Sequence, residues 1–212
     1  MNPDTLTQAV YVVDDDERAR ESVCALVGSM GLRSHAFASG EQFLDVHHHD
    51  MSGCLVTDIR MLGMSGLELQ AALSAMGSIL PVVVLTAFAS TPLTVQAIQQ
   101  GAVTLLDKPY QDDDLWNAIR KALAQDARKR VEAAHRQAIR KRIAELTRSE
   151  RAVLSYVVAG KPNKVIANRL DVSVRTVENR RSEIYTKLQV HSIVDLVKMV
   201  IEADLADSLD VN

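Results

Sequence analysis

The fold is decided by the stretch Leu55-Val56-Thr57-Asp58-Ile59-Arg60-Met61, in which a short apolar run ends in a carboxylate. Two other apolar runs, Tyr11–Val13 and Val82–Leu85, also stop at polar side chains, and neither alternates apolar with polar residues. Strands without such alternation are typically buried on both faces, as in a parallel sheet covered by helices. The stretch therefore indicates the centre of an α/β domain.

Five segments of this kind recur at regular spacing, each followed by a helix-length segment. Strands are predicted at 9–14, 32–37, 53–58, 81–86 and 103–106, and helices at 17–30, 39–46, 65–76, 91–100 and from 112 onward. Gly31 and Gly101 stand where two of these helices would end. Five consecutive strand and helix units predict an α/β doubly wound fold with a five-stranded parallel sheet.

Composition and charge limit the classes of protein. The 212 residues suffice for two domains, and 47% hydrophobic with 24% charged residues excludes a mostly disordered chain. Residues 1–126 hold 7 basic and 16 acidic side chains, whereas 127–212 hold 17 basic and 11 acidic ones. A basic half suits a phosphate-backbone ligand, although solubility alone also produces such asymmetry. Neither a membrane span nor a secretory signal is visible, so we expect a cytoplasmic protein without a membrane partner.

The basic half reads as helical throughout. Residues 112–146 contain neither Gly nor Pro and predict one long helix, of which 127–145 would link two domains. Its small apolar side chains follow a three-four spacing that fits either a short helix-pairing seam or a solvated linker: Ala124, Ala127, Val131, Ala134 and Ala138. A capping-box pattern at 147–150 opens the next helix. The tight turn 171–173, between helices at 163–170 and 174–188, is typical of a helix-turn-helix.

Polar side chains follow four of the predicted strands. Chemistry in open α/β sheets lies beyond the carboxyl ends of the strands, and a parallel sheet would bring these residues to one edge: Asp14, Asp15, Asp58, Thr86 and Lys108. Neighbouring carboxylates need a cation, and Mg²⁺ prefers oxygen ligands and bridges to phosphate. The group therefore predicts a metal-assisted phosphoryl site. Singly, each residue has a structural alternative; the acidic run 14–17, for example, would also stabilise a helix N-terminus.

Taken together, four motifs resemble the receiver domain of two-component response regulators over residues 8–126: Val12–Asp16, Leu55–Met61 with Met64–Gly66, Leu85–Ala87 and Asp107–Pro109. The resemblance implies a flavodoxin-like sheet of strand order 2-1-3-4-5. It implies that Asp58 accepts a phosphoryl group from a histidine kinase. Asp15, Asp58 and the carbonyl of Arg60 would hold Mg²⁺, with Asp14 acting through water. Lys108 would pair with the phosphoryl oxygens, and Thr86 would move to hydrogen-bond them as the switch residue.

Two positions depart from the family pattern. Leu62 replaces the usual proline, and Leu105 replaces the aromatic side chain that commonly acts as a second switch residue. The resemblance also implies a cis peptide bond between Lys108 and Pro109. On phosphorylation we expect a change in a surface that includes Thr94, Ala97, Ile98 and residues 103–106, and this change would favour a two-fold dimer.

The predicted helix 174–188 has an apolar face, formed by Val177, Ile184 and Leu188, and an opposite polar face. A helix that enters the major groove needs polar side chains to meet base edges. The candidates for base contacts are Arg175, Glu178, Asn179 and Ser182. The candidates for phosphate contacts are Lys164, Thr176, Arg181 and Lys187. A merely solvated helix surface is the alternative interpretation.

Residues 146–204 resemble the four-helix LuxR-type DNA-binding domain, through motifs that include Leu146-Thr147, Asn163-Lys164, Ile166-Ala167, Thr176-Val177-Glu178 and Lys187-Leu188. Arg180 stands where that family often has histidine. The two domains together resemble the FixJ and NarL group of transcription regulators, closest to the FixJ and StyR branch. This resemblance implies a homodimer on phosphorylation that binds double-stranded DNA, and it leaves a contact with RNA polymerase open.

The sequence thus predicts a receiver domain at 1–126, a linker helix at 127–145 and an all-α four-helix, helix-turn-helix DNA-binding domain at 146–212. The predicted function is phosphorylation-activated transcription regulation by a phosphoacceptor with at most slow autodephosphorylation, not by an enzyme. Two alternatives stay open. One is a Mg²⁺-dependent phosphohydrolase with Asp58 as nucleophile, and the other is an adaptor whose basic half binds protein independently of phosphorylation.

Overall fold

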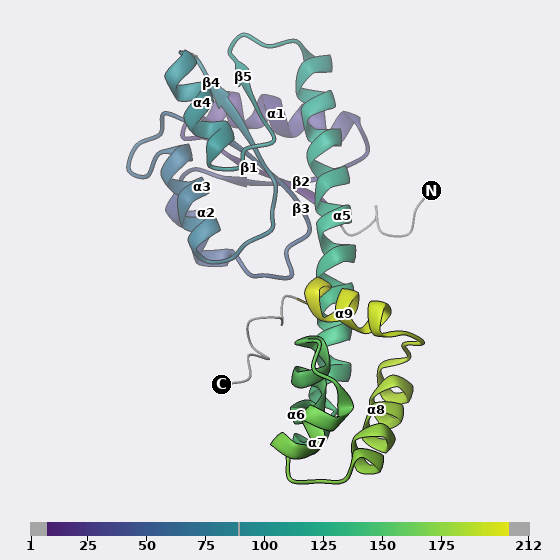
Figure 1. Cartoon of the computed structure of the whole chain (residues 1–212). Coiled ribbons are helices and arrows are strands. Elements are labelled where there is room, and N and C mark those ends of the chain that lie inside the picture. The colour runs from purple at the N-terminus through teal and green to yellow at the C-terminus, as the bar shows by residue number, and fades with distance from the viewer. Residues whose placement is uncertain (1–7, 89, 204–212) are drawn as a thin grey trace. The chain divides into compact units, whose positions relative to one another are not determined.

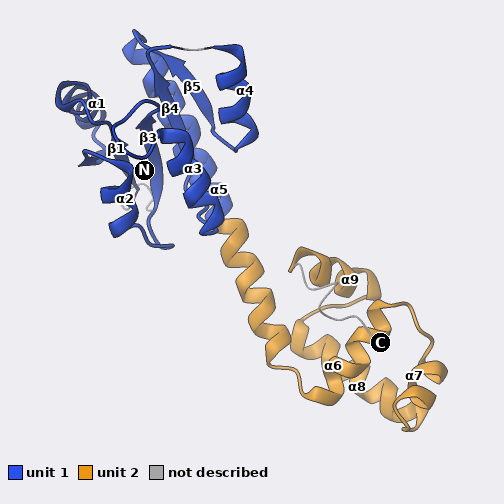
Figure 2. Cartoon of the chain, turned by 90° about the vertical axis from the view of Figure 1, so that its left-hand side faces the viewer, with its two compact units in different colours: residues 1–130 blue, residues 131–212 orange. Residues whose placement is uncertain are grey.

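The structure is a computed structural model of the chain that describes residues 8–88 and 90–203. The chain divides into two compact units, residues 1–130 and 131–212 (Figure 2). Parts of the predicted terminal segments, residues 1–7 and 204–212, lie outside the described residues.

The first unit is built on a parallel five-stranded sheet in the order β2-β1-β3-β4-β5 (Figure 1). The strands are β1 (Ala9–Val13), β2 (Arg33–Phe37), β3 (Gly53–Asp58), β4 (Val82–Thr86) and β5 (Thr104–Asp107). In register, Val13 lies beside Thr57, and Asp58 beside Leu85. The doubly wound fold and the strand order are confirmed, and the carboxyl ends of all five strands meet at one edge.

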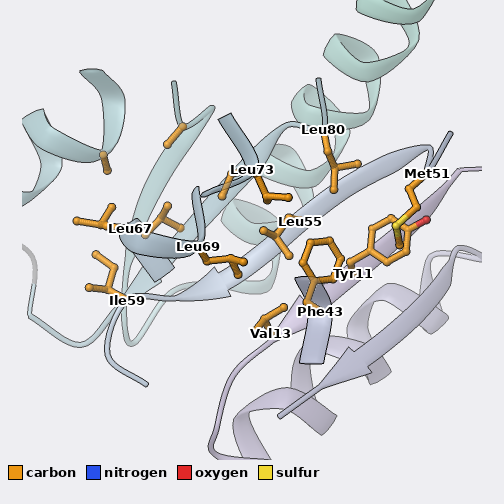
Figure 3. Close-up of a cluster of buried hydrophobic side chains, with 14 of the residues drawn as sticks. Tyr11, Val13, Phe43, Met51, Leu55, Ile59, Leu67, Leu69, Leu73 and Leu80 are labelled. Carbon is orange, nitrogen blue, oxygen red and sulfur yellow. The ribbon is translucent and has the colours of Figure 1, made fainter. Parts of the chain in front are cut away.

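Helices cover both faces of this sheet. One face carries α1 (Glu17–Ser29) and the first part of α5 (Asp112–Ala144). The other carries α2 (Gly40–Val46), α3 (Gly66–Ala75) and α4 (Thr91–Gln99). Figure 3 shows Phe43 of α2 and Leu69 of α3 packed beside Tyr11, Val13 and Leu55 of the sheet. As predicted, β1 and β4 are buried along their whole length, because helices cover them from both sides.

The turn after β3 depends on a glycine. A Cβ atom at Gly66 would lie 2.1 Å from the carbonyl oxygen of Asp58, so only glycine lets α3 begin this close to the end of the strand. Ser65 caps α3 through a reciprocal hydrogen-bond pair with Glu68. The loop 59–65 is therefore held against the carboxyl edge of the sheet.

The second unit is helical: α6 (Arg148–Val158), α7 (Asn163–Arg169), α8 (Val174–Leu188) and α9 (Ile193–Glu202) pack with the end of α5. The predicted capping box at Thr147 and Glu150 is present, and Ser173 caps α8 as expected after a tight turn. Within the described residues, no helix is long and apolar enough to span a membrane.

The predicted linker is only partly a solvated helix. Ile139 and Ile143 of α5 are 3% and 5% exposed because they belong to the core of the second unit. Val131, in the middle of the small apolar seam, is 68% exposed. The sequence pattern of α5 therefore serves two cores and leaves the seam between them on the surface.

Glu150, a buried carboxylate, ties α6 to α8 by an ion pair with the partly exposed Lys187. Its carboxylate, in a residue 3% exposed, accepts hydrogen bonds from Lys187 Nζ at 2.6 and 2.9 Å and from the backbone N–H of Thr147 at 2.7 Å. The Lys187 hydrogen bond, helped by those from Thr147, lowers the pKa of Glu150 below its usual 4.5 although burial acts in the opposite direction.

We predict that Glu150→Gln destabilises the second unit by about 1 to 2 kcal/mol at neutral pH, because it removes the charge that these donors surround. Since the pKa of Glu150 is lower in the folded chain, the contribution of the ion pair is complete above about pH 4.5 and is lost as the pH falls through the folded value. Thermal unfolding between pH 7 and 3 should show the difference from wild type shrinking in acid. The exposed Glu145→Gln is the control, and a difference that is independent of pH would contradict the prediction.

Candidate phosphoacceptor site and nucleic-acid interface

Lys108 joins two of the predicted carboxylates at the carboxyl edge of the sheet. Its Nζ lies 2.6 Å from Asp58 Oδ1 and 2.9 Å from Asp14 Oδ2. Asp14 follows β1, Asp58 ends β3 and Lys108 follows β5, so the parallel sheet itself produces the contact. Burial lowers the pKa of Lys108, but hydrogen bonds to Asp58 and Asp14 outweigh it and raise the pKa above 10.5. The ammonium therefore stays charged at neutral pH.

The other carboxylate oxygens are held by backbone amides. Asp58 Oδ2 accepts from Arg60 N at 2.6 Å, and Asp14 Oδ1 accepts from Asp16 N at 2.9 Å. Asp15 is exposed, and its Oδ2 accepts from Leu62 N at 2.9 Å. The structure thus brings Asp14, Asp58 and Lys108 into direct contact, whereas Asp15 is attached to the loop after β3.

The chemistry of the donors suits a hard divalent cation. Among the described residues, no group of three or more His, Cys, Asp or Glu side chains is arranged so that it could hold a metal ion. The predicted set of Asp14, Asp15, Asp58 and Arg60 adds a backbone carbonyl, and Mg²⁺ usually keeps several waters. By donor type alone, these residues would suit Mg²⁺ with water completing its shell.

Thr86 ends β4 and is only 1% exposed. Its Oγ1 accepts a hydrogen bond from Phe88 N at 3.2 Å, and its carbonyl accepts one from Lys108 N at 2.6 Å. The hydroxyl is thus bonded within its own loop and not to Asp58. The predicted switch residue thus lies at the carboxyl edge of the sheet, and its hydroxyl oxygen is tied to the loop that follows β4.

Two contacts around the site were not predicted. The Arg60 guanidinium lies 4.4 Å from the ring centroid of Phe88. This cation–π contact joins the loop after β3 to the loop after β4. Arg20 Nη1 donates to the carbonyl of Asp14 at 2.7 Å. A single sequence does not reveal such pairs, because many arginines and aromatic residues could satisfy each other.

One predicted surface needs correction. Ala97 was expected on the surface that changes on phosphorylation, but it is fully buried because the inner face of α4 packs on the sheet core. Ile98 of the same predicted surface is exposed as expected, at 47%, and Val95, also 47% exposed, lies with it on the outward face of α4. The cis peptide bond implied at Lys108-Pro109 is present.

In the second unit, α8 has the two faces that its sequence predicts. Val177, Ile184 and Leu188 are buried. The four candidates for base contacts are exposed on the opposite side: Arg175, Glu178, Asn179 and Ser182. Lys164 is exposed on α7, the preceding helix of the helix-turn-helix. The exposed side of α8 is therefore accessible, and an α-helix is of a size that the major groove of DNA admits.

The other three candidates for phosphate contacts have partners inside the domain. Arg181 donates from Nη1 to Asn163 Oδ1 at 2.6 Å and from Nη2 to the hydroxyl of Tyr185 at 3.2 Å. Lys187 pairs with Glu150, and Thr176 Oγ1 lies 2.8 Å from Ser173 Oγ. These residues fix α8 in its domain, and their contacts with phosphate stay predictions.

Comparison with known proteins identifies both units. Residues 10–120 match the response regulator receiver domain, and residues 144–200 match the luxR family of bacterial regulatory proteins. The transcriptional regulatory protein FixJ of Azorhizobium caulinodans is 40% identical over 201 residues, 95% of each chain. The response regulator protein TodT of Pseudomonas putida is 36% identical over 201 residues, which cover 95% of this chain and 88% of TodT.

Solved structures agree with this assignment. The response regulator StyR shares the fold with a TM-score of 0.76 and 36% identity, over 92% of this chain and 99% of that chain. The relatives named above are regulators, not enzymes. The chain belongs to the two-component response regulators that join a receiver domain to a LuxR-type DNA-binding domain, and it is a transcriptional regulator related to FixJ and StyR.

Proposed function

We propose that Asp58 is the phosphoacceptor and that its esterification by a histidine kinase controls DNA binding by the second unit. The observation that supports this most directly is the contact of Lys108 with Asp58 and Asp14 at the carboxyl edge of the sheet. An ammonium that stays charged next to one carboxylate can neutralise the oxygens of a phosphoryl group attached to that carboxylate.

In the transfer step, an oxygen of Asp58 attacks phosphorus while the bond to the histidine nitrogen of the kinase breaks. Lys108 orients toward the phosphoryl oxygens, and the amide of Arg60 holds the second Asp58 oxygen. Mg²⁺, bound by Asp15, Asp58 and the Arg60 carbonyl with Asp14 acting through water, would supply further positive charge to those oxygens. None of the side chains in this contact is a catalytic imidazole, which is consistent with slow autodephosphorylation.

The ester adds charge and acceptor oxygens next to Thr86. The Thr86 hydroxyl can donate its proton to them while its oxygen still accepts from the N–H of Phe88, so a movement of Thr86 toward the phosphoryl group would draw the loop after β4 with it. That loop leads into α4, whose outward residues are Val95 and Ile98. Leu105 is half-buried against the core beside α4 and has no aromatic ring to rearrange, so Thr86 carries the switch at this point.

We predict that Asp58→Ala lowers labelling by a small radioactive phosphodonor with Mg²⁺ by at least about tenfold, because the nucleophilic oxygen is removed. The control is Asp113→Ala, an exposed carboxylate at the start of α5. Equal labelling of both variants would refute the assignment. Rapid multiple turnover of phosphomonoesters by the wild type would instead favour the phosphohydrolase.

For DNA, we propose that the exposed side of α8 reads bases in the major groove and that Lys164 contacts phosphate. Asn179→Ala should cost about 1 to 3 kcal/mol at the specific site and leave non-specific binding nearly unchanged. Lys164→Ala should weaken binding to every sequence and reduce the salt slope by about 1. Fluorescence anisotropy over a salt series measures both, with Lys121→Ala on the receiver as a charge-matched control. If neither variant alters duplex binding, the protein-binding adaptor becomes the better interpretation.

The expected homodimer has a candidate surface on α9. Leu196 and Val200 of this helix are buried in the domain, yet a second apolar stripe remains exposed, with Val194 70%, Ile201 62% and Ile193 40% exposed. Lys198 and Glu202 border the stripe and lie 3.8 Å apart. In a two-fold pair of α9 helices these opposite charges could pair across the axis, which suits a second copy of this chain bound to two half-sites. A contact with RNA polymerase stays a prediction.

We predict that Ile201→Glu raises the dimer dissociation constant by at least about tenfold, because the new carboxylate would be buried in the contact. Analytical ultracentrifugation of the phosphorylated full chain measures this constant. Val46→Glu places the same charge on an exposed apolar position of α2 and should have no effect. Unchanged association in Ile201→Glu would exclude α9 as the dimer surface.

A further inference from the structure

Asp126 of α5 is a fully buried carboxylate that the proposed chemistry does not use. It accepts hydrogen bonds from Gln8 Nε2 at 3.1 Å, from Ser52 Oγ at 2.8 Å and from Gly53 N at 2.9 Å. Gln8 precedes β1, and Ser52 and Gly53 lead into β3. One carboxylate thus fastens α5 to the amino ends of two central strands, at the edge of the sheet opposite Asp58.

Arg130, one turn further along α5, completes the network. Its Nε donates to both oxygens of Asp126, at 2.9 and 3.1 Å, and its Nη2 donates to the carbonyl of Met51. The backbone at Gly53 is shaped for this arrangement: its φ is +132°, and a Cβ atom there would lie 1.7 Å from the carbonyl oxygen of Ala9. The close approach of β1, β3 and α5 therefore depends on both the glycine and the ion pair.

The position of this network along α5 suggests what it does. Leu123 is the last buried apolar residue of α5 in the first unit, and Ala124 and Val131 are exposed. The first unit ends at Arg130, while α5 continues without a break to Ala144. Beyond Leu123, polar contacts hold α5 on the receiver as far as Arg130, the last residue of the first unit. Hydrogen bonds are directional, so they restrict the rotation of the helix about its axis in a stretch where no fully buried apolar side chain does so.

We propose that Asp126 and Arg130 form an exit clamp that fixes the direction of α5 where it leaves the receiver, and that phosphorylation reaches the DNA-binding unit only while this clamp is closed. The proposal rests on the phosphorylation-controlled function above. A helix that frays from the receiver between Leu123 and Arg130 would absorb a change in the receiver by local unfolding instead of passing it on. The clamp residues are positioning residues, since they contact neither phosphate nor DNA.

The test compares Arg130→Gln with wild type in the full chain. Arg130 is partly exposed, and Asp126 keeps three other donors in the variant, so the receiver should fold. Three quantities are measured: labelling of Asp58 by a small phosphodonor, the ratio of DNA affinities with and without phosphorylation, and amide hydrogen exchange over residues 124–130. Lys121→Gln, an exposed position on the same helix, is the charge-matched control.

We expect Arg130→Gln to label like wild type and to bind DNA like wild type when unphosphorylated, while its gain in DNA affinity on phosphorylation falls at least about fivefold. Amides 124–130 should exchange at least about tenfold faster in both states. Arg130→Lys, which keeps a charge beside Asp126, should recover part of both effects. A full affinity gain, or unchanged exchange, in Arg130→Gln would overturn the clamp.

Two further outcomes separate this proposal from the function on which it rests. Loss of labelling together with a lower unfolding temperature in Arg130→Gln would show that the residue only supports the receiver fold, and would also overturn the clamp. If wild type itself gains no DNA affinity on phosphorylation, the proposed function fails. In that case, unchanged amide exchange over residues 124–130 in Arg130→Gln would refute the clamp as well. Faster exchange would support only the claim that Asp126 and Arg130 hold α5 on the receiver.

Discussion

An ammonium held between two carboxylates is the interaction on which the receiver depends. Without Lys108, Asp14 and Asp58 would be two like charges nearly buried at the same edge of a sheet, and burial of unpaired charge is costly. The arrangement follows from the parallel sheet, because only parallel strands deliver the ends of β1, β3 and β5 to one edge. The same charge that permits this burial is the one that a phosphoryl group on Asp58 would use. The stability of this edge and the phosphoacceptor role that we propose for Asp58 therefore depend on the same charge.

The central strand β3 has a polar tie at each end. At its carboxyl end, Gly66 lets the following helix approach Asp58 closely, and the Arg60 amide fixes one oxygen of that carboxylate. At its amino end, Gly53 donates to Asp126 of α5. Apolar packing of β3 on both faces makes the strand rigid between these points. The proposed phosphoacceptor and the attachment of the long helix thus lie at opposite ends of a single strand.

In the second unit, the polar side chains that hold the helices together differ from those that α8 exposes. An ion pair between Glu150 and Lys187 ties α6 to α8, and a hydrogen bond from Arg181 to Asn163 ties α8 to α7, so polar contacts support the apolar core of this unit. These contacts leave Arg175, Glu178, Asn179 and Ser182 on the opposite side of α8. Of the basic side chains, Arg181 and Lys187 thus make contacts within the domain, whereas Arg175 stays exposed.

Local pattern in the sequence determined the strands and helices to within a residue or two at most ends, the helix-turn-helix, and the set of polar residues at the carboxyl edge, because periodicity and strand ends are properties of neighbouring residues. Tertiary structure alone decided the rest. Ala97 turned inward, Ile139 and Ile143 joined the second core, and Asp15 bonded to the loop after β3 instead of to Lys108. Asp126 found partners 73, 74 and 118 residues away. Such pairings depend on which surfaces meet when the chain closes, and a charged residue in a helix pattern carries no sign of the partner that will bury it.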